Sequence, residues 1–246
     1  MRRVIAILAA LTLPLAFAAH ASAADKVYVQ LNEEGIKQAL VKKAYGPPWL
    51  GKVVNPIVKV EMTGVKPMEC TTKGTVIKGM KSSSYGYSFM EFAQSKAGHY
   101  MDFQQWLYQY PNGEDAFAAW TDLLDKAKGC AGTHTHTVYD EQNQELVTFQ
   151  VKITVFEGLP QYGYNSLVIN EDVLVTSELA SGAKYKDASD EISIWRFDGN
   201  AITESELNKF VPKYKKWVFS EAQIATIETL SFLAMQRYHL AAYKSV

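Results

Sequence analysis

Hydrophobic residues alternate with polar or small residues through much of the middle of the chain, which is the period of two typical of β-strands with one buried face. The alternation at 85–89 and 101–107 predicts two antiparallel strands joined through the polar stretch 93–98. The sequence DGN at 198–200 predicts a tight hairpin later in the chain. Further strands are predicted at 133–139, 147–155, 164–175, 192–197 and 201–203.

A helical period replaces this alternation at two places. Asn112 is a good N-cap, and Gly129 is predicted to end the helix that follows it. The apolar stripe that would face a core consists of Ala116, Trp120, Leu123, Leu124 and Ala127. Ser220 and Gln223 form a candidate capping box for a long helix that runs to about Tyr243. Because its apolar residues cover more than one side, we expect this helix to pack across the sheet.

The N-terminal part of the chain carries weaker patterns. Residues 25–31 are predicted to be extended, and a helix is predicted over 32–44. The prolines in the stretch 45–48 end that helix, because proline cannot continue the backbone hydrogen bonding. The region 51–70 mixes apolar residues with prolines, and no state is predicted for it.

The first 23 residues have the pattern of a secretory signal peptide. Arg2 and Arg3 precede an apolar run, and the small residues Ala21-Ser22-Ala23 form a cleavage site. The apolar run is too short to favour a permanent membrane helix. No cysteine follows the cleavage site, so we do not expect a lipid to be attached there. The mature chain is therefore expected to be exported.

The predicted mature chain, 24–246, is long enough for one substantial core, and we predict a single exported domain. Removing Arg2 and Arg3 leaves 23 basic residues against 26 acidic ones, a net charge of −3. Such a charge gives no electrostatic reason to bind a nucleic acid or an anionic membrane. No later segment has the apolar length of a transmembrane helix, so none is expected after cleavage of the signal.

Cys70 and Cys130 are the two cysteines of the chain, and both lie in the exported part. In an oxidising compartment an even pair is expected to form a disulfide bond. A catalytic thiol would need an environment that lowers its pKa. Cys130 instead follows the predicted end of a helix, where the helix dipole disfavours a thiolate. A structural disulfide is the better interpretation.

His134 and His136 lie within the stretch KGCAGTHTHTVYD. Residues two apart on a strand point to the same face, so both imidazoles could reach one metal ion. A metal site needs a third and usually a fourth ligand, and no HExxH motif or paired-cysteine spacing accompanies them. We therefore interpret them as surface histidines, and they are only weak candidates for a metal site. No cofactor is expected.

The motifs of several enzyme classes are absent from the sequence. It contains no GxSxG elbow, no Walker loop and no GxGxxG fingerprint. Acidic side chains gather in two places, Asp187 with Asp190 and Glu191, and Glu204 with Glu206. We interpret both groups as loop and helix-start residues rather than as acid–base pairs. The sequence thus favours a protein that is not an enzyme.

Five aromatic residues are candidates for a ligand-binding surface. They are Tyr85, Tyr87, Trp106, Tyr108 and Tyr110, which could form one aromatic face on adjacent strands. Such faces bind sugars and acyl chains, although a strand face of this kind more often belongs to a core. Both interpretations stay open at this point.

Several segments resemble the exported sensor-type domains of actinobacteria, whose reference member is the extracellular domain of mycobacterial PknH-type receptor kinases. The segment WLYQYPNGEDAFAAWTDLLDKAKGC at 106–130 is similar to a strand of that family, its Tyr-Pro turn and an alanine-rich helix that leads to a cysteine. The stretch 67–70 resembles the upstream cysteine segment, and 196–202 resembles the late hairpin of the family. The family includes free-standing secreted proteins and lipoproteins.

The resemblance covers about 66–242 and makes that part a sensor-like core, preceded by a helix and an extended segment in 24–65. It implies an α+β fold, in which a curved antiparallel β-sheet packs against helices that include a long C-terminal one. It also implies a cleft for an extracellular ligand. The chain departs from the kinase domain, which carries a second disulfide and is linked to a membrane helix and a kinase.

These observations predict a secreted, non-catalytic, ligand-binding or sensor-like protein that acts at the cell envelope or outside the cell. Its partner would be a small molecule, a glycan or a lipid of the envelope. The alternative is a secreted hydrolase that acts on cell-envelope material through an unrecognised active site.

Overall fold

The computed structural model describes residues 26–40, 52–61, 70, 85–94, 100–158, 165–179, 181–211 and 219–245. The predicted signal peptide and the end of the predicted helix at 32–44 lie outside these residues. None of the helices in the described part of the chain is long and apolar enough to span a membrane.

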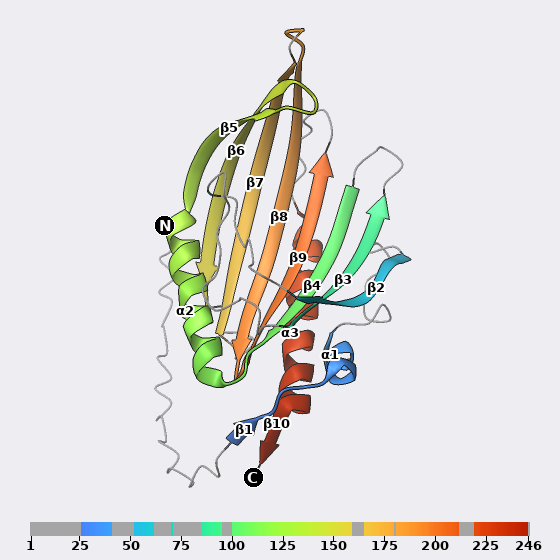
Figure 1. The fold of residues 1–246 in the computed structure, drawn as a ribbon, viewed down its shortest axis with the longest axis vertical. Coiled ribbons are helices and arrows are strands. Elements are labelled where there is room, and N and C mark those ends of the chain that lie inside the picture. Colours follow the sequence, from blue (N-terminus) through green and yellow to red (C-terminus); the bar gives the residue numbers. More distant parts are fainter. Residues whose placement is uncertain are drawn as a thin grey trace, which may run out of the picture.

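Eight of the described strands form one antiparallel sheet in the order β2-β3-β4-β9-β8-β7-β6-β5 (Figure 1). Their bounds are β2 Lys52–Glu61, β3 Tyr85–Gln94, β4 Tyr100–Gln109, β5 Gly132–Asp140, β6 Glu145–Glu157, β7 Asn165–Leu179, β8 Lys184–Asp198 and β9 Ala201–Val211. A separate two-stranded sheet pairs β1 (Lys26–Tyr28) with β10 (Tyr243–Ser245), near the two ends of the described chain. The predicted antiparallel sheet is therefore confirmed.

The three helices of the described chain are α1 (Glu33–Ala39), α2 (Gly113–Cys130) and α3 (Glu221–Ala242). The predicted caps are confirmed, since Asn112 Oδ1 accepts a hydrogen bond from the backbone of Asp115 and Ser220 forms a capping box with Gln223. Gly129 does not end α2, which continues to Cys130 and is capped by Ala131.

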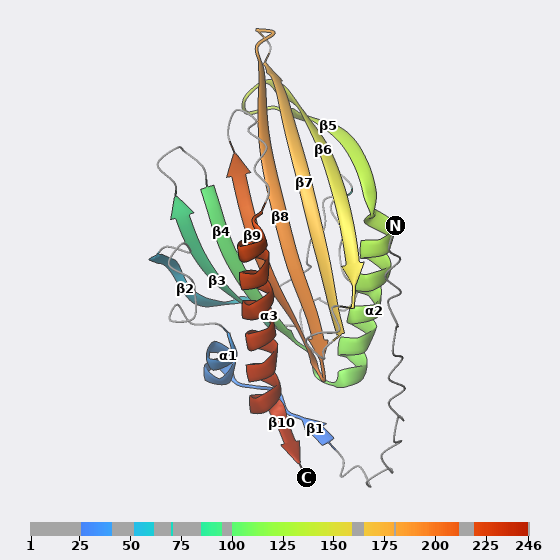
Figure 2. The same cartoon turned by 180° about the vertical axis from the view of Figure 1, so that it is seen from behind.

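The two long helices lie on opposite faces of the sheet (Figures 1 and 2). We call the face that packs against α2 the α2 face and the other the α3 face. The α2 face contributes to a buried cluster that includes Tyr108, Trp120, Leu123, Ile169 and Trp195. The α3 face contributes to a second cluster that includes Phe103, Ile192, Ile194, Leu207, Ile227 and Leu230. Each cluster follows the period-two alternation of its strands.

The strands are longer than the alternation predicted, because their polar residues belong to the sheet as well. Asp187, Asp190 and Glu191 lie in β8, and Glu204 and Glu206 lie in β9. The interpretation of these acids as loop and helix-start residues is wrong. Polar side chains on neighbouring strands share rows across the sheet, which alternation along one strand cannot reveal.

A buried polar junction joins α3 to the turn between β8 and β9. The Tyr238 hydroxyl donates to Asn200 Oδ1 at 2.6 Å and lies 3.1 Å from Gln109 Oε1. The backbone carbonyl of Asn200 accepts a hydrogen bond from the backbone N–H of Tyr110 at 2.8 Å. The Gln109 side-chain amide accepts a hydrogen bond from the backbone N–H of Leu31 at 2.8 Å and donates one to the carbonyl of Leu31 at 3.0 Å. Because buried polar groups need partners, this junction determines where the C-terminal half of α3 sits.

Gly199 occupies the first central position of the two-residue turn between β8 and β9, with φ of +57°. Glycine is favoured there because side chains disfavour a positive φ. Tyr28 of β1 packs on this turn, and a Cβ added to Gly199 would overlap the Tyr28 ring. The turn is therefore also the docking point of the N-terminal strand.

Cys70 and Cys130, which are 60 positions apart in the sequence, form the predicted disulfide bond. Cys130 is the last residue of α2 and is buried in the cluster of the α2 face. The bond thus anchors the C-terminal end of α2.

Replacing both cysteines, Cys70→Ala with Cys130→Ala, is expected to lower the free energy of unfolding. The loss should be on the order of 4 kcal/mol, because the cross-link reduces the entropy of the unfolded chain. Urea denaturation measures the change. Reduced wild-type protein should unfold at a similar urea concentration, and an unchanged midpoint in both samples would contradict the structural role.

Gly199→Ala should destabilise the protein more than Gly158→Ala. Both glycines have a positive φ, but a Cβ at Gly158 meets no atom within 4 Å, so only Gly199→Ala adds a clash with Tyr28. The backbone strain common to both variants costs about 1 kcal/mol. Chemical denaturation of the two variants side by side tests the difference, and equal midpoints would show that Tyr28 adjusts without cost.

Candidate functional site

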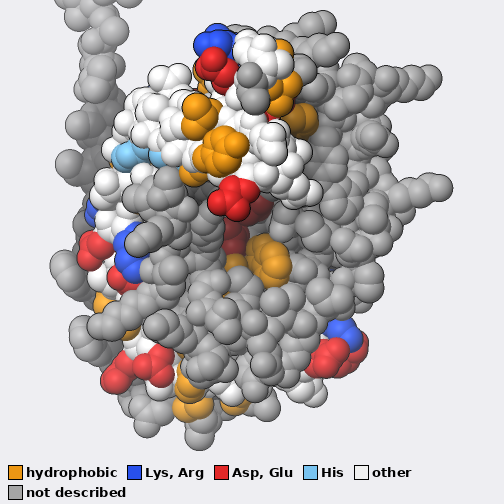
Figure 3. All heavy atoms as spheres, turned by 45° about the horizontal axis from the view of Figure 1, so that its top comes forward, with side chains coloured by type: hydrophobic (Ala, Val, Ile, Leu, Met, Phe, Trp, Pro, Cys, Tyr) orange, Lys and Arg blue, Asp and Glu red, His pale blue; other side chains and the backbone are white. Residues whose placement is uncertain are grey.

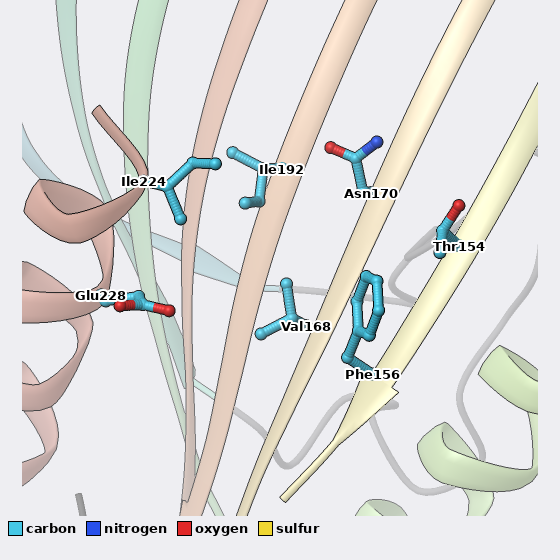
Figure 4. A pocket seen from close by; sticks show the side chains of 7 residues that line it. All are labelled: Thr154, Phe156, Val168, Asn170, Ile192, Ile224 and Glu228. Atoms are coloured by element: carbon cyan, nitrogen blue, oxygen red, sulfur yellow. The ribbon is translucent and has the colours of Figure 1, made fainter. Parts of the chain in front are cut away.

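An open groove of about 360 Å³ lies on the α3 face, between the N-terminal half of α3 and strands β6, β7 and β8. Its volume is within the range of small-molecule sites. The lining residues are Thr154, Phe156, Val168, Asn170, Ile192, Ile224 and Glu228 (Figure 4). Most of them are apolar, and the others bring an amide, a hydroxyl and a carboxylate.

The floor of the groove consists of two rows of side chains that run across the strands. Thr154, Asn170 and Ile192 form one row, since they are direct partners in the pairings β6–β7 and β7–β8. Phe156 and Val168 form the adjacent row. Val168 and Ile192 are buried, with 7% and 4% of their surface exposed, whereas Phe156 remains 54% exposed. The floor thus slopes from the core of the α3 face to an exposed aromatic ring.

The wall of the groove is one side of α3. Ile224 and Glu228 are one helical turn apart, so they lie on the same side of the helix. Figure 4 shows the Glu228 carboxylate directed from α3 toward Val168, above the floor. No described helix covers β6 and β7 on the α3 face, so the groove is open on the side away from α3 (Figure 2).

No residue of this groove was among the predicted site residues. The signal that could have pointed to it is the adjacency of apolar residues in strands that otherwise alternate. Val155 precedes Phe156, and Leu167, Val168 and Ile169 are consecutive, so β6 and β7 carry apolar side chains on both faces.

The predicted aromatic residues Trp106, Tyr108 and Tyr110 lie on the α2 face, in or against its buried cluster. Tyr108 and Tyr110 are each 1% exposed, and Trp106 is half-buried. The Tyr108 ring stacks on Trp195 with 5.8 Å between ring centres. The structure therefore places these side chains among the core contacts of α2.

The other two aromatic candidates, Tyr85 and Tyr87, lie in β3. The register pairs Tyr85 with Gln109, not with Tyr108 or Tyr110. The side chains of Tyr85 and Tyr87 lie outside the described part of the structure.

Carboxylates occupy the α2 face beside this aromatic cluster. Glu171 and Glu204 are buried, and Glu171 is the direct cross-strand partner of Glu191. The Tyr108 hydroxyl donates to Glu204 Oε2 at 2.6 Å. In Figure 3, acidic and hydrophobic side chains lie together in a hollow near the centre of the view.

Burial raises the pKa of Glu204 well above its ordinary value, and the nearby Glu206 carboxylate raises it further. The hydrogen bond from Tyr108 opposes this shift but does not reverse it. Burial, followed by the effect of Glu204, also raises the pKa of Tyr108. The pair therefore retains its protons over a wider pH range than the free side chains would.

His134 and His136 lie on the same face of β5, opposite Val151 and Phe149 of β6. His134 Nε2 donates to the carbonyl of Cys130 at 2.7 Å, and the His136 ring stacks on Phe149. Among the described residues, no group of three or more His, Cys, Asp or Glu side chains is arranged to hold a metal ion.

A second contact that the sequence did not predict joins Asp198, His239 and Tyr28. The Tyr28 hydroxyl donates to Asp198 Oδ1 at 3.0 Å, and His239 Nδ1 contacts Asp198 Oδ2. The His239 ring also stacks on Tyr243 of β10. These contacts hold β1 and β10 against α3 and the β8–β9 turn.

Glu204→Gln should weaken the pH dependence of stability. In the wild type the raised pKa favours folding while Glu204 is protonated, and this contribution is lost as the pH rises from about 4.3, the ordinary glutamate pKa, through the higher folded value. Urea denaturation at several pH values should show a steeper fall for the wild type. Glu141→Gln in the exposed β5–β6 turn should retain the wild-type slope, and equal slopes in all three proteins would contradict the shift.

The chain is similar in fold to the crystal structure of the extracellular domain of PknH from Mycobacterium tuberculosis. The TM-score is 0.52, the sequences are 12% identical, and the alignment covers 85% of this chain and 99% of that one. No protein-family model matches the sequence, and no curated protein matches it either. The resemblance predicted from the sequence is thus shown at the level of the fold.

Proposed function

We propose that this protein is a secreted, non-catalytic ligand-binding or sensor-like protein, and that the groove between α3 and β6–β8 is its binding site. The ligand would be a small molecule or a lipid of the cell envelope that inserts an apolar group into the groove.

The observation that carries the proposal is the combination of a mostly apolar floor with an open mouth. Val168 and Ile192 provide a floor that is already buried by the fold, and Phe156 extends it as an exposed ring. A ligand that covers exposed apolar surface removes it from water, and this burial favours binding. Thr154, Asn170 and Glu228 add polar groups that can orient the ligand.

Several observations support a location outside the cytoplasm. The start of the sequence has the pattern of a signal peptide, and the Cys70–Cys130 disulfide is of a kind that persists in oxidising compartments. The solved domain with a similar fold is an extracellular one.

The alternative of a secreted hydrolase has no specific observation in its favour. A hydrolase needs a nucleophile or an activated water beside a base. The described contacts of His239 are with Asp198, Tyr28 and Tyr243, which tie the terminal strands to α3. We therefore interpret the contacts of His239 as structural and assign no reaction to this histidine.

Nile red, a neutral apolar dye that fluoresces when it leaves water, tests the groove. Wild-type protein should bind it, and Thr154→Trp should reduce the affinity by about tenfold or more, because the indole ring fills space that the dye would occupy. Fluorescence titration gives both affinities.

Thr148→Trp is the matched control, because Thr148 lies on the same strand and the same face but outside the groove. This variant should bind the dye as the wild type does. Equal binding by all three proteins, or no binding by the wild type, would overturn the assignment of the groove as the site.

A further inference from the structure

The polar groups of the groove all present hydrogen-bond acceptors. The Asn170 side chain donates from Nδ2 to Asp172 Oδ1 at 3.3 Å, and its carbonyl oxygen can accept a hydrogen bond from a ligand. Figure 4 shows this oxygen directed toward Ile192. The Glu228 carboxylate accepts hydrogen bonds when it is ionised, and the Thr154 hydroxyl can donate or accept. Among the described residues that line the groove there is no lysine, arginine or histidine.

Glu228 stands out among the acidic residues of the structure by its surroundings. It lies at the edge of an apolar floor and is half-buried. It forms no hydrogen bond or ion pair with any residue in the described ranges. A carboxylate beside apolar surface loses part of its hydration, and a positive charge on a ligand would compensate for that loss.

The described cations nearest the groove are not among its lining residues. Arg196 of β8 is buried and donates from Nε to Ser231 of α3, and Lys209 of β9 is buried as the cross-strand partner of Asp190. The row of side chains adjacent to Asn170 contains Asp172 of β7, with Lys152 of β6 and Asp190 of β8 as its direct partners. Lys152 is exposed and pairs with Asp172 in register, on the far side of the groove from α3. Among the described lining residues, Glu228 is therefore the one charged side chain.

From this arrangement we infer that the ligand is a cationic amphiphile, in which a protonated amine meets Glu228 and the Asn170 carbonyl while its apolar chain lies on Val168 and Phe156. The inference rests on the proposed function, because it specifies the ligand of the same groove. A neutral amphiphile would lack the ion pair with Glu228, and an anionic one would meet the repulsion of Glu228.

Displacement of Nile red by three ligands with the same chain tests the inference at neutral pH. The ligands are octylamine, octanol and octanoate, which carry a positive, a zero and a negative charge. Octylamine should bind about tenfold more tightly than octanol, since its ammonium forms an ion pair with the Glu228 carboxylate that the octanol hydroxyl cannot form, and octanoate should bind most weakly. The preference should decrease at high salt.

Glu228→Gln should lower the affinity for octylamine to that for octanol and leave octanol binding unchanged. The matched control is Glu221→Gln, a change of the same kind at an exposed position in the first turn of α3 that does not line the groove. It should preserve the preference for octylamine.

The outcomes separate the two proposals. If Nile red does not bind in the groove, the proposed function fails. If Nile red binds in the groove but octylamine and octanoate displace it equally, or Glu228→Gln keeps the full preference for octylamine, the groove remains the site and the inference of a cationic ligand is overturned.

Discussion

Adjacent strands of a sheet lie about 4.8 Å apart, whereas an α-helix with its side chains is about 10 Å wide, so one helix covers about two strands. In the described chain α3 contacts β8 and β9, whereas β6 has its helix contacts with α2 on the other face. The sheet is therefore wider than the described helices can cover. Apolar side chains of β6 and β7 that no described helix covers become the floor of a groove, and the side of α3 becomes its wall.

The width of that groove depends on a polar junction at the far end of the helix. Tyr238 is bonded to Asn200 and lies close to Gln109, and burial raises the pKa of its hydroxyl, so the group stays a hydrogen-bond donor. Shifting α3 sideways would leave these buried groups without partners, at about 1–3 kcal/mol for each. Ile224 lies about 20 Å along the helix from this junction, given the rise per residue. The junction thus holds the wall in place without closing the groove.

Two glutamates show how the same side chain takes different roles on the two faces. Glu204 is buried on the α2 face, where Tyr108 donates to it and burial raises its pKa, so it is part of the packed interior. Glu228 lies on the α3 face at the edge of an open apolar surface and has no partner in the described residues. The first carboxylate is satisfied by the fold itself, whereas the second is the group that we propose to contact the ligand.

Local patterns in the sequence determined many elements of this protein. The caps at Asn112 and Ser220 and the hairpins depend on residues that are close together in sequence. The disulfide could be predicted because the chain has two cysteines, which can pair in one way. The ends of β8 and β9 could not be predicted, because acidic residues such as Glu204 belong to a strand only through their pairing with residues of neighbouring strands. The groove could not be predicted either. Whether Phe156, Val168 and Glu228 meet depends on strand register and on where α3 rests, and only tertiary packing decides these, since they arise from contacts between residues far apart in sequence.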